Sequence, residues 1–150
     1  MQRNISYKKP ITPLIYIGLF ILYSSLGSIY PLLPPLLAVL FVLFIKALNK
    51  KDVAALGLVS LCLIVFEVNY GYILFSTIFY FYTIHKFILP KIQQNFNCYA
   101  CIRILYVLLA YIGYFLFLLL ISKIFLLPEP NIDYYIVYYI VIEFFLVSLL

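Results

Sequence analysis

The chain has 150 residues, of which 67% are hydrophobic and only 10% are charged, and its mean hydropathy is +1.16. Soluble domains contain about 25% charged residues, so this composition excludes an ordinary water-soluble fold and predicts a protein embedded in lipid. A membrane-spanning helix needs about 20 apolar residues, which allows at most about six or seven spans and leaves no room for a soluble domain. We therefore predict a single all-α transmembrane domain over residues 1–150, built as a polytopic bundle of six spans.

Six apolar segments, separated by polar or proline-rich turns, form the predicted spans. They cover about residues 11–30, 34–47, 53–68, 72–89, 102 or 105–127, and 134–150. The basic segment 1–9 resembles the start of a signal peptide. However, the apolar stretch after it is longer than the roughly 7–15 residues of a signal core, and no small-residue cleavage site follows. The first segment is therefore predicted to remain as a span.

Proline positions set the predicted span ends. Pro34 and Pro35 suit the first turn of the second span, where an amide would lack a helical partner anyway. Pro90 is expected to stop the fourth span. All eight prolines fall at predicted span ends. Secondary transporters often use helices that Gly or Pro interrupts near the membrane midplane, so this pattern argues against such a transporter.

Basic residues set the predicted orientation. With the N-terminus in the cytoplasm, nine of the ten Lys and Arg residues lie on the cytoplasmic side, and only Lys123 lies on the outer half. This asymmetry is the positive-inside pattern, so we predict a multi-pass protein of the bacterial inner (cytoplasmic) membrane with both termini in the cytoplasm. Anionic lipid headgroups account for the net charge of +5, and no soluble surface remains to bind nucleic acid.

Two groups of residues are expected to face neighbouring helices rather than lipid. Tyr80, Tyr111 and Tyr114 fall in the middle of predicted spans, where a hydroxyl needs a protein partner. One face of the first span carries small residues, which let two helices approach closely, and these are Ser24, Gly27 and Ser28.

The sequence contains no recognisable catalytic or cofactor-binding set. His85 is the only histidine, and neither a glycine-rich phosphate loop nor a nucleophile elbow occurs. Cys98 and Cys101 form a C-x-x-C motif in the predicted cytoplasmic loop, where thiols stay reduced. Structural zinc needs four ligands, and only His85 could join this pair. We therefore predict no enzymatic activity, no cofactor and no metal, and the role of the two cysteines stays open.

Glu143 is the most informative residue because it lies near the middle of the sixth span. A charge at that depth costs about 2.5–3.5 kcal/mol, so the side chain should face the bundle interior and have a partner. Lys123, on the neighbouring fifth span, is one candidate partner. The alternative is a protonated Glu143 that bonds to a neighbouring helix. A proton or ion relay is the functional interpretation of the same residue.

Two further polar residues complete the candidate set of intramembrane structural or partner contacts. Glu67 lies at the outer end of the third span, where it competes for Lys123 or is solvated. Asn69 follows it in the next turn of the chain. Together with Lys123, these residues would form part of a polar site near the outer face.

A proline-led second span (residues 34–40) is followed by a short basic loop, and a small-residue third span (residues 54–57) ends in the acidic Glu67. In this order of features, and in its length and six-span plan, the chain resembles the MreD family of the bacterial rod-shape machinery. The acidic residue of that family is usually Asp in a G-x-x-G-L-x-x-D-like stretch. Here Glu67 takes its place, Leu63 stands where a Gly is expected, and Gly71 would be the later Gly.

The resemblance implies a non-enzymatic subunit of the cell-shape and elongation machinery. Such a protein binds the single-span periplasmic protein MreC and helps to link the MreB filament to peptidoglycan synthases. Two alternatives remain: a ligand-binding S-component of an energy-coupling-factor transporter, which would need the outer polar site, and a membrane assembly subunit of another kind. Self-association into a homo-oligomer also stays open.

Overall fold

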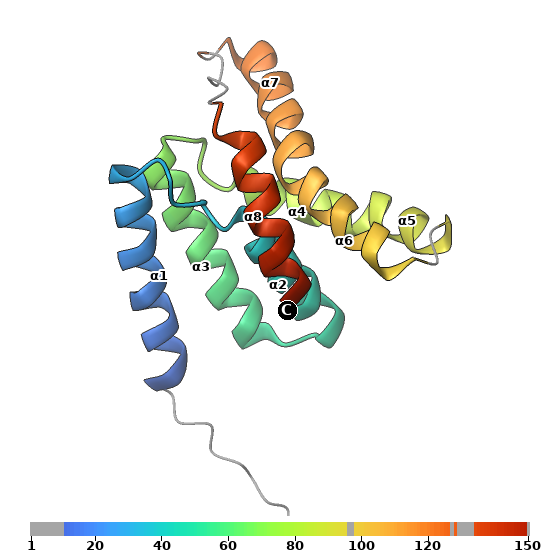
Figure 1. Cartoon of the computed structure of the whole chain (residues 1–150), viewed down its shortest axis with the longest axis horizontal. Coiled ribbons are helices and arrows are strands. Elements are labelled where there is room, and N and C mark those ends of the chain that lie inside the picture. Colours follow the sequence, from blue (N-terminus) through green and yellow to red (C-terminus); the bar gives the residue numbers. More distant parts are fainter. Residues whose placement is uncertain (1–10, 96–97, 127, 129–133, 150) are drawn as a thin grey trace, which may run out of the picture.

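The computed structural model describes residues 11–95, 98–126, 128 and 134–149, and every regular element among them is helical (Figure 1). The predicted all-α fold is therefore confirmed. Two helical segments, Val53–Tyr70 and Ala100–Phe125, are long and apolar enough to cross a membrane. Ile17–Ile29 and Ile136–Leu149 are shorter apolar helices. These segments indicate an association with the membrane.

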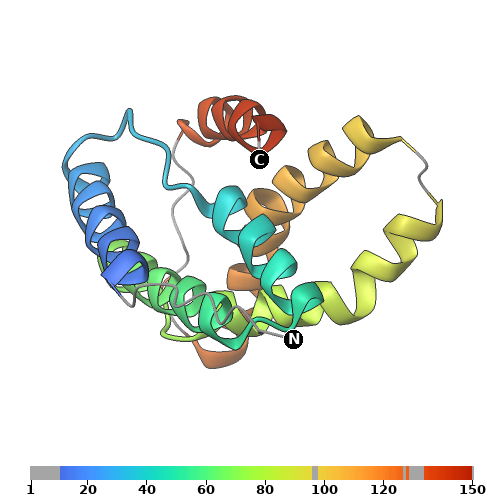
Figure 2. The same cartoon turned by 90° about the horizontal axis from the view of Figure 1, so that it is seen from below.

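The helices form six stretches of the described chain, and two stretches contain a π-helical turn. The elements are α1 (Ile11–Ile29), α2 (Leu37–Lys50), α3 (Val53–Tyr70), the continuous α4–η1–α5 (Ser76–Thr83, Ile84–Ile88, Leu89–Asn95), the continuous α6–η2–α7 (Tyr99–Leu108, Leu109–Gly113, Tyr114–Phe125) and α8 (Ile136–Leu149). Figure 2 shows that α5 and α6 extend to one side of the bundle, opposite α1.

Helix α2 forms the centre of the bundle. Eight of its 14 residues are buried, and the helix packs against α3, α6, α8 and η2. Figure 2 shows it crossing the middle of the fold. Phe41 lies 4.7 Å from Phe81 of α4 between ring centroids, and both side chains are fully buried. Lipid is as apolar as a protein core, so this pair stabilises the bundle through close packing of the two rings.

The predicted start of the second span at Pro34 is wrong, because α2 begins at Leu37. A residue that precedes proline is pushed out of the helical region, so Pro35 keeps Pro34 extended. Leu36 then adopts a left-handed conformation with φ of 58°. The helix can therefore begin only after Leu36.

The small-residue face of α1 packs against α3, as predicted for two of its three members. Ser24 and Gly27 are buried, and the Asn69 side-chain amide donates to Ser24 Oγ at 2.7 Å. Ser28 is exposed, and its hydroxyl donates to the carbonyl of Ser25 on its own helix. The first two residues therefore mark the α1–α3 contact.

The expected helix stop at Pro90 is also wrong. The helix continues through Pro90 to Asn95, and a π-helical turn precedes the proline. In that turn, the Leu89 amide donates to the carbonyl of Ile84, five residues back. Proline in an ordinary helix clashes with the carbonyl four residues earlier. The wider π turn gives the ring room, so the helix bends rather than ends.

The second π turn lies where the three mid-span tyrosines gather. Tyr80, Tyr111 and Tyr114 are all buried, as predicted. The Tyr80 hydroxyl donates to the carbonyl of Leu109, the first residue of the π turn, at 2.8 Å. A Cβ added at Gly113 would lie 2.0 Å from the Tyr80 hydroxyl, so this approach requires glycine.

Candidate functional site: two buried glutamates beside a tyrosine-lined cavity

The chain between α1 and α2 enters the bundle as non-helical backbone over residues 31–36. Two tyrosine hydroxyls bind its carbonyls. Tyr23 donates to Pro34 O at 2.7 Å, and Tyr139 donates to Pro31 O. Carbonyls outside a regular helix need other hydrogen-bond partners, and these hydroxyls supply them. The segment connects the end of α1 to the start of α2, so these prolines lie between two helices and interrupt neither.

Glu143 of α8 binds the N-terminus of α2. Its side chain is fully buried, and its carboxylate accepts the amide of Leu37 at 3.1 Å and the amide of Ala38 at 2.6 Å. The Tyr111 hydroxyl donates to the same carboxylate. The first amides of a helix have no partner within it, and the helix dipole favours a negative charge there. The predicted interior orientation of Glu143 is confirmed.

Of the two candidate arrangements for Glu143, the structure shows contacts with neighbouring helices and not the pairing with Lys123. Lys123 is exposed on α7, and the described contacts to Glu143 come from amide and hydroxyl donors. Removing a second charge from water would cost several kcal/mol, on the order of the gain from a buried ion pair. Backbone amides at a helix start already point at the site and carry no full charge, so they bind the carboxylate at lower cost.

Glu67 of α3 binds the N-terminus of α4 in a similar way. Its side chain is fully buried, so the expectation of a solvated residue, or of a partner for Lys123, is wrong. The carboxylate accepts the amides of Phe75 and Thr77, both at 2.6 Å. The hydroxyls of Thr77, at 2.6 Å, and Ser76, at 3.2 Å, complete the set. Two backbone amides and two hydroxyls therefore surround this carboxylate.

The two glutamate sites share the same construction. Each capped helix follows a bulky residue with positive φ: Leu36 at 58° and Phe75 at 66°. Each carboxylate comes from a different helix, and each site includes a tyrosine of the α6–η2–α7 stretch. Tyr111 bonds to Glu143 directly, and Tyr114 bonds to the Ser76 hydroxyl at 2.9 Å. A negative charge at a helix N-terminus contributes up to about 2 kcal/mol, so these sites position α2 and α4.

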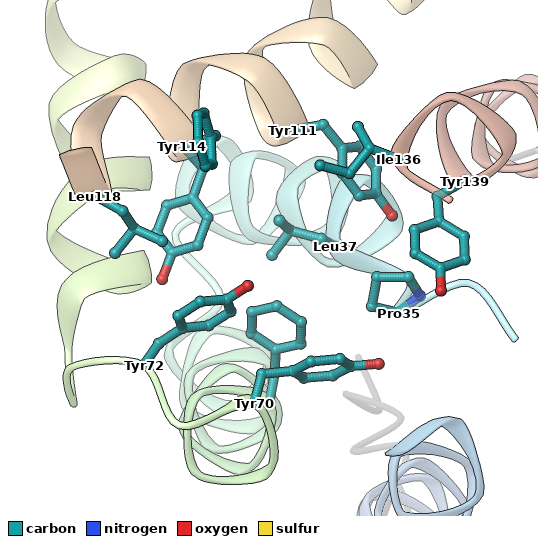
Figure 3. Close-up of a pocket in the computed structure, with 11 residues that line it drawn as sticks. Pro35, Leu37, Tyr70, Tyr72, Tyr111, Tyr114, Leu118, Ile136 and Tyr139 are labelled. Carbon is teal, nitrogen blue, oxygen red and sulfur yellow. The ribbon is translucent and has the colours of Figure 1, made fainter. Parts of the chain in front are cut away.

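A cavity of about 110 Å³ lies between the two glutamate sites. Five tyrosines line it (Figure 3), and these are Tyr70, Tyr72, Tyr111, Tyr114 and Tyr139. The remaining lining is apolar and consists of Pro35, Leu37, Phe66, Phe115, Leu118 and Ile136. In Figure 3, Tyr70 and Tyr72 lie on one side of Leu37, and Tyr111 and Tyr139 lie on the other. We refer to this space as the tyrosine cavity.

The predicted outer polar site is not assembled. Glu67 faces the start of α4, Asn69 bonds to Ser24 of α1, and Lys123 is exposed on α7. These three residues were expected together because they share one predicted membrane depth. They point in three different directions around the bundle, so they serve separate contacts.

Cys98 and Cys101 lie at the start of α6. Cys98 is exposed and precedes the first helical residue, and Cys101 is one turn further along. A hydrogen bond from the Cys101 side chain lowers the pKa of the Cys98 thiol. Among the described residues, no three His, Cys, Asp or Glu side chains group as metal ligands.

The sequence did not reveal that Tyr70, Tyr72 and Tyr139 line a cavity, or that Tyr23 binds the non-helical segment. The useful signal was the count of 16 tyrosines, together with the unusual run of prolines in residues 31–35. Carbonyls next to proline residues form no regular helix bonds, so nearby hydroxyls become their partners.

No protein-family model matches the chain, and neither a curated protein nor a solved structure matches it significantly.

Proposed function

We propose that this protein is a non-enzymatic subunit of the bacterial inner membrane, and that its first helix binds the single membrane span of a partner protein. The proposal takes up the resemblance to the MreD family, which implies an MreC-like periplasmic partner and a role in cell elongation and peptidoglycan synthesis. It assigns six spans to the chain, with both termini in the cytoplasm.

The observation that carries this proposal is an exposed apolar seam on α1. Five large side chains, each between 50% and 69% exposed, follow one another at alternating intervals of four and three residues: Ile15, Leu19, Leu22, Leu26 and Ile29. This repeat averages 3.5 residues, which is the repeat of a seam between two helices in a left-handed coiled coil. The seam is the face of α1 that is turned away from α3, so it is the face that a second helix could contact. The resemblance to a family that binds a single-span partner is the reason for proposing a helix there.

The arrangement of the helix ends supports the proposed topology. In Figure 1, the start of α1, the turn between α2 and α3 and the end of α8 lie toward one end of the bundle. The turns that follow α1 and α3, and the end of α7, lie toward the other. Helix α2 has 14 residues and is about 21 Å long, so residues 31–36 supply the rest of its crossing.

The contacts of the two buried glutamates support a structural role for these carboxylates. Each carboxylate binds the amides and hydroxyls that begin a neighbouring helix. Such bonds position helices and leave the seam on α1 for partner binding.

Co-purification tests the proposal. We replace Leu22 and Leu26 together by alanine in the tagged full-length protein and recover it from membranes in mild detergent. We expect the amount of a co-purified single-span periplasmic protein to fall about tenfold or more, because both side chains would leave the centre of the interface. Cells that carry this variant should lose their rod shape.

The matched control replaces Leu116 and Leu120 on α7, which have the same spacing and are 55% and 62% exposed. This variant should keep the partner and the cell shape. Equal recovery of the partner with both variants would contradict the α1 interface. Recovery of ATPase subunits in place of a single-span protein would contradict the proposed function and favour an energy-coupling-factor transporter.

A further inference from the structure

The tyrosine cavity has a ring-rich wall. Tyr70 and Tyr72 stack at 6.2 Å between ring centroids with an interplanar angle of 13°, and Tyr72 meets Tyr114 edge to face at 5.8 Å. Phe66 lies against both Tyr70 and Tyr72, at 4.8 Å and 5.8 Å. The face of an aromatic ring carries negative potential. A wall of several such rings attracts a cation that has little hydration to lose.

The charges around the cavity have the sign that a cation needs. Glu67 and Glu143 are fully buried, and none of the described donors to either carboxylate is Lys, Arg or His. Each capped helix N-terminus contributes about +0.5 of an elementary charge. Each helix end therefore offsets only part of the charge of an ionised carboxylate, and a cation in the cavity would be attracted by the remainder.

Hydroxyl contacts connect both carboxylates to the cavity wall. Tyr111 lines the cavity and donates to Glu143. Tyr114 lines the cavity and bonds to Ser76, which donates to Glu67. A phenol that donates to a carboxylate gains electron density in its ring. Hydroxyls of the cavity wall therefore lie one or two hydrogen bonds from each carboxylate, although neither glutamate lines the cavity.

The size of the cavity selects the kind of cation. A cavity needs roughly 10–15 Å³ to hold one water molecule. A cavity of about 110 Å³ therefore holds a molecule of roughly seven to ten non-hydrogen atoms. A bare metal ion would leave most of that space empty, and none of the described residues that line the wall has a carboxylate side chain to bind it. An alkylammonium ion matches both the size and the apolar, aromatic lining.

We propose that the tyrosine cavity binds a small organic cation of the alkylammonium class. The two glutamate sites would supply the electrostatic attraction for the cation, and the aromatic wall would supply its van der Waals and cation–π contacts. This site lies away from the exposed seam of α1, so the inference does not depend on the proposed partner.

Binding of choline to the purified full-length protein in detergent tests the inference. The chain contains 16 Tyr and no Trp, so its intrinsic fluorescence reports on tyrosines alone. Choline should change that fluorescence saturably and raise the thermal unfolding midpoint. Dimethylbutanol, the neutral carbon isostere of choline, should do neither at the same concentration, and sodium chloride serves as the ionic-strength control. Equal effects of choline and the isostere would show that the cavity is only an apolar pocket and would overturn the inference. The absence of a saturable effect of choline at millimolar concentration would also overturn it.

Two substitutions at Tyr70 distinguish ring contact from folding. Tyr70→Phe keeps the aromatic ring and should bind choline within about twofold of the parent protein. Tyr70→Leu removes the ring and should weaken choline binding by about 2- to 30-fold, at an unchanged helical content. Unchanged affinity in a folded Tyr70→Leu protein would place the cation outside this cavity and contradict the inference.

Discussion

The carboxylate of Glu143 accepts the backbone amide of Ala38 at 2.6 Å, across 105 positions of the sequence. This bond joins the middle of the last helix to the first turn of the central one. The same carboxylate also binds the amide of Leu37 and the hydroxyl of Tyr111, so it holds three elements together. Helix α2 can therefore begin inside the bundle because α8 supplies the cap that its own N-cap residue, Leu36, lacks.

The first prediction concerns this cap. We expect Glu143→Gln to lower the free energy of unfolding in detergent by about 1–3 kcal/mol, because its amide nitrogen cannot accept a backbone N–H. Glu143→Leu should cost about 3 kcal/mol or more, since two amides and a hydroxyl lose their partner. The control, Lys123→Met, should change stability by less than about 0.5 kcal/mol because the side chain is exposed. If Lys123→Met lowered stability as much as Glu143→Gln does, the result would support an ion pair between Lys123 and Glu143.

The second prediction is a coupling at the other cap. Glu67 and Thr77 are joined by a side-chain bond of 2.6 Å, so their substitutions should not add. A cycle of Glu67→Gln, Thr77→Val and the double variant should give a coupling of about 0.5–3 kcal/mol. Glu67→Gln combined with Glu143→Gln should be additive within about 0.5 kcal/mol, because the two carboxylates cap different helices. Additivity in the first pair would show that the Thr77 hydroxyl is not bound to Glu67.

The third prediction is a rescue at the second π turn. Gly113→Ala should lower stability by about 1–3 kcal/mol, because the new methyl group would meet the Tyr80 hydroxyl. In a Tyr80→Phe background, the same substitution should cost much less, since that oxygen is gone. Gly57→Ala is the control, because nothing lies within 4 Å of an added Cβ there. It should raise stability by about 0.4–1 kcal/mol. Equal costs of Gly113→Ala in both backgrounds would refute the close approach.

The fourth prediction is the pH dependence of Cys98 alkylation. The Cys101 bond lowers the pKa of Cys98, so the thiolate should form at lower pH than in an ordinary cysteine. Cys101→Ala removes the bond, so the midpoint of the rate-against-pH curve should move to higher pH and the rate at neutral pH should fall. Maleimide labelling followed by mass spectrometry reports the rate at Cys98 separately from the buried Cys62. An unchanged midpoint in Cys101→Ala would mean that the two thiols do not interact.

The buried position of Glu143 could be predicted from its sequence, because depth in an apolar segment forces a charged side chain inward. The identity of its partner could not be predicted from the sequence. The start of α2 depends on the positive φ of Leu36 and on the path of residues 31–36, and both are set by contacts with Tyr23 and Tyr139 from distant helices. Lys123 seemed the partner only because charge and sequence neighbourhood are visible without structure, whereas free backbone amides are not.

The helix ends show the same limit. Proline rules predicted a stop at Pro90, and the π turn that lets the helix continue has no signal in the local sequence. In the sequence, Glu67 looked like a residue at the end of a span. In the structure, the next helix begins at Ser76 and its first amides turn back toward α3, where they bind Glu67. By contrast, the burial of the three mid-span tyrosines followed from depth alone and was predicted correctly.

A photo-crosslinking scan along α1 tests whether its exposed seam binds a partner helix. A photoreactive residue is placed in turn at each position from 15 to 29 of the full-length protein in living cells. We expect strong adducts with one single-span protein at the seam positions and only weak adducts between them; the seam positions are Ile15, Leu19, Leu22, Leu26 and Ile29. Adducts with lipid alone at all of these positions, or protein adducts without the 3.5-residue repeat, would contradict it.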